Sequence, residues 1–177
     1  MNRNSQYCEQ VYQIILRQEV AISYPEKVRK LVLYSTGSIG ALPGRFETID
    51  QSKSRITNEG AETAAERISA TWFKELTDSP FHQECANLAK KANLKTMLHG
   101  LDAMKSWDRH NDLGRIGAET MIMWGTEDRT YNRVQINLLF DRIKNSHLQI
   151  IPDTAHAIHD EKAPELAAIL NGYLVWL

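Results

Sequence analysis

The sequence predicts an α/β fold in which short parallel strands are covered by helices on both faces. The first observation is three apolar runs, each bounded by turn or charged residues and none alternating between apolar and polar positions. Such runs are typical of strands buried on both faces of a sheet. The second observation is that segments with a helical spacing of apolar residues lie between and around these runs. The three predicted strands are Lys30–Tyr34, Thr120–Trp124 and Leu148–Ile151.

The chain opens with a predicted helix over Gln6–Tyr24, where apolar residues recur with a helical period. Pro25 ends this helix, because proline lacks the N–H that a helix interior requires. The helix leads into the first buried strand, and Ser35–Pro43 forms a glycine-rich exit from that strand. The start of the chain therefore predicts a helix, a strand and a loop.

The middle of the chain contains no run that resembles a strand, and we expect it to be helical. Ser79-Pro80 separates two of the predicted helices. The expected helices are Glu59–Glu75, Phe81–Lys91 and Leu94–Trp107.

The last third of the chain predicts a strand, a helix and a strand. The helical spacing of Asn132–Ile143 lies between the second and third runs, which is the pattern of a crossover between parallel strands. Ala163–Leu177 then predicts a closing helix, with Pro164 in its first turn, where proline is tolerated.

Composition excludes several classes of protein. The 177 residues have a formal net charge of −1, which argues against a nucleic-acid partner or an anionic membrane surface. Two cysteines do not make a disulfide framework. No apolar run reaches the roughly 18 residues that a membrane span needs, and the first ten residues lack the apolar core of a signal peptide. We therefore expect a cytoplasmic protein.

Polar residues follow the second and third predicted strands directly. Asp128 lies in the turn after the second strand, and His156 lies in the turn after the third. Because the carboxyl ends of parallel strands meet at one sheet edge, we expect these two side chains to be adjacent. A carboxylate that accepts from one imidazole nitrogen leaves the other nitrogen available as a base.

Plainer interpretations of the same residues exist. An aspartate after a glycine at a strand end is often a turn or helix-cap residue. A single loop histidine is often only hydrogen-bonded. Asp153, His156, His159 and Asp160 lie close in sequence, but the more specific zinc pattern H-E-x-x-H is missing. We expect neither a metal site nor a cofactor.

Three stretches resemble the C-terminal part of the α/β-hydrolase fold family. Tyr24–Ser38 is similar to the segment that enters the strand after the nucleophile helix, Leu113–Tyr131 to the acid strand and turn, and Ile151–Glu165 to the histidine loop. The surrounding sequence resembles members that hydrolyse C–C bonds and enol-lactones. The resemblance implies that residues 1–56 and 109–177 form a partial hydrolase core, while 57–108 form a helical cap. It further implies that Asp128 and His156 are catalytic.

The family's nucleophile is a serine in G-x-S-x-G, which the resemblance implies near Val11. Residues 5–20 contain no glycine, so the sharp turn has no suitable residue there. The nucleophile is therefore unknown, and Ser5 and Cys8 are the nearest side chains of the right type. A neighbouring glutamate would oppose thiolate formation at Cys8.

Aromatic and methionine side chains of the helical middle are candidates for a substrate pocket beneath the cap, or else for ordinary helix-packing core. These candidates are Trp72, Met97, Met104 and Trp107.

Two classes of function follow. In the first, the chain belongs to a serine hydrolase of esters, lactones or C–C bonds in small organic acids, and is weak or inactive alone. In the second, it is a non-catalytic subunit, a swapped dimer or a degenerate fragment. The first predicted strand would then pair with another chain, because an exposed strand edge invites pairing. A separate chain that supplies the amino-terminal half and completes the site is a third alternative.

Overall fold

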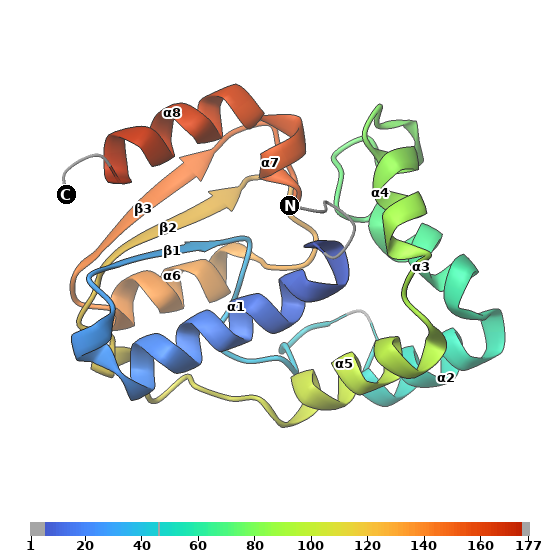
Figure 1. The fold of residues 1–177 in the computed structure, drawn as a ribbon, viewed down its shortest axis with the longest axis horizontal. Helices are drawn as coiled ribbons and strands as arrows, with labels where there is room; N and C mark the ends of the chain where they lie inside the picture. The colour runs from blue at the N-terminus through green and yellow to red at the C-terminus, as the bar shows by residue number, and fades with distance from the viewer. Residues whose placement is uncertain (1–5, 46, 175–177) are drawn as a thin grey trace.

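The computed structural model describes residues 6–45 and 47–174, with side chains described from Ile15 onward. Its centre is a parallel sheet of three strands in the order β1-β2-β3 (Figure 1). The strands are β1 (Lys30–Tyr34), β2 (Glu119–Gly125) and β3 (Ser146–Ile151), and both pairings are parallel. The three predicted strands and the α/β class are therefore confirmed.

Helices cover both faces of the sheet. Helix α1 (Gln6–Ser23) and helix α6 (Arg133–Arg142) pack on one face, where Ile22, Leu33 and Ile136 belong to one buried cluster. Helix α8 (Ala163–Leu174) covers the other face, where Leu166 packs with Met123 and Ile151. Burial from two sides explains why the strand sequences are apolar without alternation.

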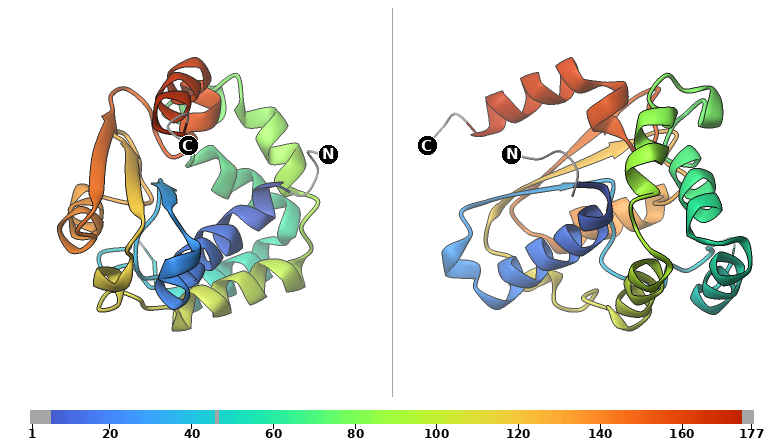
Figure 2. Two further views of the ribbon diagram at one scale, coloured as in Figure 1. Left: turned by 60° about the vertical axis from the view of Figure 1, so that its left-hand side comes forward. Right: turned by 45° about the vertical axis from the view of Figure 1, so that its right-hand side comes forward.

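Four helices form a separate layer beyond the carboxyl ends of the strands, as Figure 1 and the right panel of Figure 2 show. Three of them enclose an apolar cluster around Ile49, Ile56 and Leu101, while the fourth contributes Cys85 to a second cluster with Phe73 and Ala157. The chain enters and leaves this layer at one place, where Ile39 and Asp108 form an antiparallel bridge. The four helices are α2 (Ile49–Glu59), α3 (Ala61–Ala70), α4 (His82–Ala89) and α5 (Leu94–Ser106).

Three helices differ from the prediction. The expected helix Glu59–Glu75 ends at Ala70, and α2, which was not predicted, precedes it. Helix α2 begins with a capping box, in which the Thr48 side chain accepts from the Gln51 main chain while the Gln51 side chain accepts from the Thr48 main chain. The short helix α7 (Ile158–Glu161) was not predicted either. Within residues 6–45 and 47–174, no helix is both long and apolar enough to cross a bilayer.

Gly40, in the loop after β1, packs directly against the main chain of helix α5, and we expect its replacement to destabilise the fold. A Cβ atom at this position would lie 2.1 Å from the Met104 carbonyl oxygen, which belongs to the main chain and cannot swing away. Gly40→Ala should lower the free energy of unfolding by about 1–3 kcal/mol, measured by urea denaturation. Gly172→Ala is the matched control, since nothing lies within 4 Å and helix α8 should gain roughly 0.5–1 kcal/mol. Equal effects of the two substitutions would contradict this packing account.

Candidate functional site

The loops that follow β2 and β3 lie directly against each other. Gly125 ends β2, and a Cβ atom there would stand 2.4 Å from the carbonyl oxygens of Thr154 and Ala155. Only a residue without a side chain permits this crossing. The main chain then joins the two loops, because Glu127 N–H donates to the Thr154 carbonyl at 3.0 Å.

This crossing brings Asp128 and His156 together. His156 Nδ1 lies 3.1 Å from Asp128 Oδ2, so the predicted adjacency is confirmed. The Asp128 side chain is fully buried, while 16% of the His156 side chain is exposed. The histidine therefore faces solvent or a ligand in part, and its carboxylate partner does not.

The Asp128 carboxylate is held by its own turn. Its Oδ1 accepts from the main-chain N–H of Thr130 at 2.8 Å and from that of Tyr131 at 3.2 Å. With Oδ2 turned to His156, both oxygens act only as acceptors. Nδ1 of His156 must then carry the hydrogen of the contact, which leaves the lone pair of Nε2 available to accept a proton.

Two aromatic rings flank the imidazole of His156. The Tyr131 ring stacks on it with centroids 5.9 Å apart and planes inclined by 18°, and the Trp72 ring lies 6.0 Å away. Burial, and secondarily the charge of Asp128, raises the pKa of Tyr131 to about 12, so the phenol stays neutral at physiological pH. Tyr131 was not among the site residues predicted from the sequence, although its place three residues after Asp128 was a usable signal.

The predicted pocket residues lie in different places. Trp72 lies against His156, but Met97 and Met104 pack against the internal cluster of the helical layer. The Trp107 indole N–H donates to Glu19 Oε1 at 2.8 Å, beside the paired contact between Arg109 and Glu19. The hydrogen bond from Arg109 is the main cause that lowers the pKa of Glu19. The pocket role of these four side chains stays a prediction.

The predicted nucleophile candidates cannot be placed. Ser5 lies outside the described residues, and the side chain of Cys8, which belongs to helix α1, lies outside the described side chains. Among the side chains that the structure describes, Asp128 alone hydrogen-bonds the imidazole of His156. Ser35 contacts this loop differently, because its hydroxyl donates to the His156 carbonyl oxygen at 2.9 Å.

The second histidine of the loop has separate partners. His159 Nδ1 lies 3.1 Å from the Tyr34 hydroxyl, and its Nε2 lies 3.5 Å from Asp160. Burial lowers the pKa of His159, which disfavours its charged form. In the described part of the chain, histidine, cysteine and acidic side chains do not gather in a group of three that would hold a metal ion.

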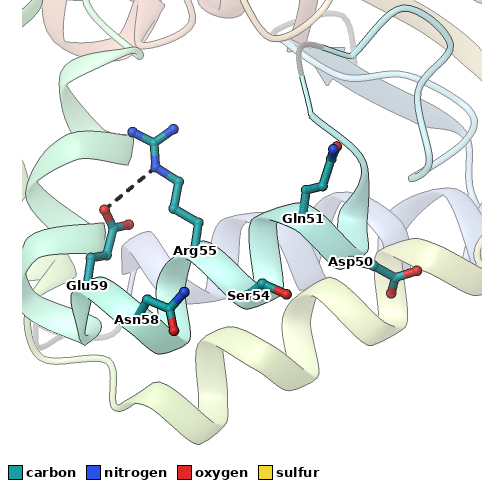
Figure 3. Close-up of a pocket in the computed structure, with 6 residues that line it drawn as sticks. All are labelled: Asp50, Gln51, Ser54, Arg55, Asn58 and Glu59. Atoms are coloured by element: carbon teal, nitrogen blue, oxygen red, sulfur yellow. Dashed lines mark ion pairs between the residues drawn. The ribbon is translucent and has the colours of Figure 1, made fainter.

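A surface hollow of ≈ 650 Å³ lies elsewhere, on one side of helix α2 (Figure 3). Arg55 and Glu59 lie one helical turn apart along it and form an ion pair, with Nε and Oε2 3.7 Å apart. Neither Asp128 nor His156 borders this hollow, so it is not part of the candidate site. Its lining residues are Asp50, Gln51, Ser54, Arg55, Asn58 and Glu59.

Comparison with curated proteins finds distant relatives. A 2-hydroxy-6-oxo-6-phenylhexa-2,4-dienoate hydrolase of Burkholderia cepacia is 27% identical over 77% of this chain and 50% of its own length. A putative non-heme chloroperoxidase of a Synechocystis strain is 33% identical over 65% of this chain and 37% of its own length. The chain spans about half the length of the curated relatives it matches. No protein-family model matches the chain.

Solved structures match nearly the whole chain. The enol-lactonase of Burkholderia xenovorans superposes with a TM-score of 0.80 at 15% identity, over 93% of this chain and 63% of that one. An esterase of Exiguobacterium antarcticum superposes with a TM-score of 0.75 at 16% identity, over 96% of this chain and 73% of that one.

The contact between Asp128 and His156 makes a spectroscopic prediction. In Asp128→Asn, the amide oxygen can still accept from Thr130 and Tyr131, so the amide NH₂ must face His156 Nδ1. We expect the hydrogen to move from Nδ1 to Nε2, which the ¹⁵N chemical shifts of the imidazole report. Asp141→Asn, an exposed change on α6, is the control. An unchanged tautomer in Asp128→Asn would contradict the described geometry.

Proposed function

Because this chain has part of an α/β-hydrolase fold, we propose that Asp128 and His156 are the acid and the base of a Ser–His–Asp hydrolase site. The observation that carries this proposal is the 3.1 Å contact between the two side chains at the carboxyl ends of adjacent parallel strands. The nucleophile of the site would come from outside the side chains that the structure describes.

In this proposal, Nε2 of His156 takes the proton of a serine hydroxyl as the serine oxygen attacks the substrate carbonyl. Collapse of the tetrahedral intermediate breaks the bond to the leaving group, which receives that proton from His156. His156 then takes a proton from water as the water oxygen attacks the acyl-serine carbonyl. Collapse of this second intermediate releases the acid, and the serine oxygen takes its proton back from His156. Asp128 stays ionised and holds the imidazolium in place.

The substrates we propose are esters, lactones or C–C bonds of small organic acids. A relative described as a 2-hydroxy-6-oxo-6-phenylhexa-2,4-dienoate hydrolase, and superposed structures described as an enol-lactonase and an esterase, support this range. The two rings beside His156 favour a substrate with an apolar part. We further propose that the helices of residues 57–108 cap the site, since Trp72 extends from that segment to His156.

A fluorophosphonate probe, followed by intact mass and peptide mapping, tests the role of His156. We expect the chain alone to show weak or no turnover of a short p-nitrophenyl ester. Where a serine label forms, in the chain alone or in a complex purified with it, His156→Ala should reduce its rate by roughly 10³-fold or more. His147→Ala, an exposed change on β3, should leave it intact. A stoichiometric serine label that persists in His156→Ala would refute the proposed base.

The second candidate function is that of a subunit that pairs through β1. Arg29 C=O accepts from Glu119 N–H, and Ser35 N–H donates to Met123 C=O. Since main-chain groups alternate in direction along a strand, the N–H and C=O groups of Lys30, Val32 and Tyr34 point away from β2. Among the described strands, β1 pairs with β2 alone. We propose a second copy, or a complementing chain, as the partner of this edge.

The direction of the Val32 N–H gives this idea a selective test. Proline removes that N–H without breaking a bond to β2, so Val32→Pro should fold and yet block strand addition. We expect size-exclusion light scattering to detect a dimer or larger complex of the unmodified chain and a monomer of Val32→Pro. Leu33→Pro is the contrast, because its N–H faces β2 and its loss should unfold the sheet. A clean monomer of the unmodified chain at native concentration would contradict self-pairing.

A further inference from the structure

The turn Trp72–Lys74, between helices α3 and α4, is joined by its main chain to both loops of the candidate site. Three consecutive carbonyl oxygens of this turn accept hydrogen bonds. Trp72 O accepts from the N–H of Ala157 at 2.9 Å, whereas Phe73 O and Lys74 O accept from the two terminal nitrogens of Arg129 at 2.9 and 3.0 Å. Arg129 and Ala157 are the residues next to Asp128 and His156.

The carboxylate of Glu161 in α7 makes the fourth connection. Its Oε1 accepts from the Lys74 N–H at 2.7 Å. Its Oε2 accepts from the Thr154 hydroxyl at 2.6 Å and from the Ala155 N–H at 2.7 Å. One side chain therefore ties the loop just before His156 to the helical layer. Figure 1 and the right panel of Figure 2 show this turn beside α7.

We infer that Arg129 and Glu161 are positioning residues. Both bind the main chain of the Trp72–Lys74 turn, and this shared attachment fixes the position of Asp128 relative to His156. The inference rests on the proposed role of His156 as a base, and it adds the two side chains that set the geometry of that base. Each works through hydrogen bonds that fix direction, because guanidinium and carboxylate groups present two coplanar contacts.

The surroundings leave the turn little freedom. Phe73 is fully buried and packs with Cys85 and Ala157. Its ring stacks near Phe81 with centroids 6.4 Å apart. A shift of helices α3 and α4 would therefore displace Arg129 and Glu161 together. Through them it would also displace the two loops that carry the Asp128–His156 pair. The proposed cap is in this way mechanically joined to the base that it covers.

Glu161→Gln tests the positioning role of Glu161 with almost no change in the shape of the side chain. A glutamine has one acceptor oxygen, so either the Lys74 N–H or the Ala155 N–H must face an NH₂ group. We expect roughly a tenfold fall in the ratio of the Nδ1–H to the Nε2–H tautomer of His156, because its loop is released from one side. The imidazole ¹⁵N shifts measure this ratio at a pH where the ring is neutral. Glu165→Gln, the same change at an exposed position of α8, should leave the ratio unchanged.

Arg129→Lys is the second variant and acts from the other loop. Lysine keeps the positive charge but cannot bind two consecutive carbonyl groups in one plane, so we expect a shift in the same direction. Arg115→Lys, at an exposed arginine whose described ion pair is with Asp112, is its control.

The tautomer ratio distinguishes a positioning role of these two side chains from a purely stabilising one. If Glu161→Gln and Arg129→Lys lower the melting temperature but have the same tautomer ratio as the unmodified chain, the inference is overturned. If the ratio shifts in both and in neither control, it is upheld. The ratio belongs to the imidazole and needs no turnover, so it tests the positioning role separately from the hydrolase function. A responsive ratio together with a serine label that persists in His156→Ala would count against the proposed hydrolase function alone.

Discussion

The close crossing of two main-chain segments at Gly125 is the constraint on which the candidate site depends. Only with a bare Cα at the end of β2 can the carbonyl groups of Thr154 and Ala155 lie across it. That crossing sets the height of the histidine loop above the sheet and so decides whether Nδ1 of His156 reaches Asp128. The hydrogen bond between the two side chains is therefore a consequence of backbone packing, and it does not itself hold the loops together.

Burial determines the electrostatic surroundings of the His156 imidazole at this edge of the sheet. The carboxylate of Asp128 is enclosed and accepts hydrogen bonds from two N–H groups of its own turn, so its oxygens are satisfied by the protein itself. The same enclosure keeps the neighbouring phenol of Tyr131 neutral. His156 is thus placed between an ionised group on one side and apolar ring faces on the other, an environment that directs any exchange of protons toward Nε2.

Much of this arrangement could be predicted from the sequence, because it depends on contiguous patterns. Apolar runs marked the three strands, and the positions of Asp128 and His156 just beyond two of them placed both at one edge. Helix α2 was missed since few of its residues are apolar and its start depends on the Thr48 capping box. Arg129 and Glu161 were missed for another reason. Their contacts join segments far apart in the chain, and no local pattern records which main-chain group a side chain will reach.

The bridge between Ile39 and Asp108 brings the two ends of the helical layer together. The entropy of closing a loop rises only slowly with the number of residues in it, so a longer or shorter segment between these two ends changes the cost of closure little. Helices of the layer can therefore be lengthened, shortened or exchanged during evolution while β1 and β2 remain paired. In such a fold, the helical layer and the sheet can diverge at independent rates, except where the Trp72–Lys74 turn joins them.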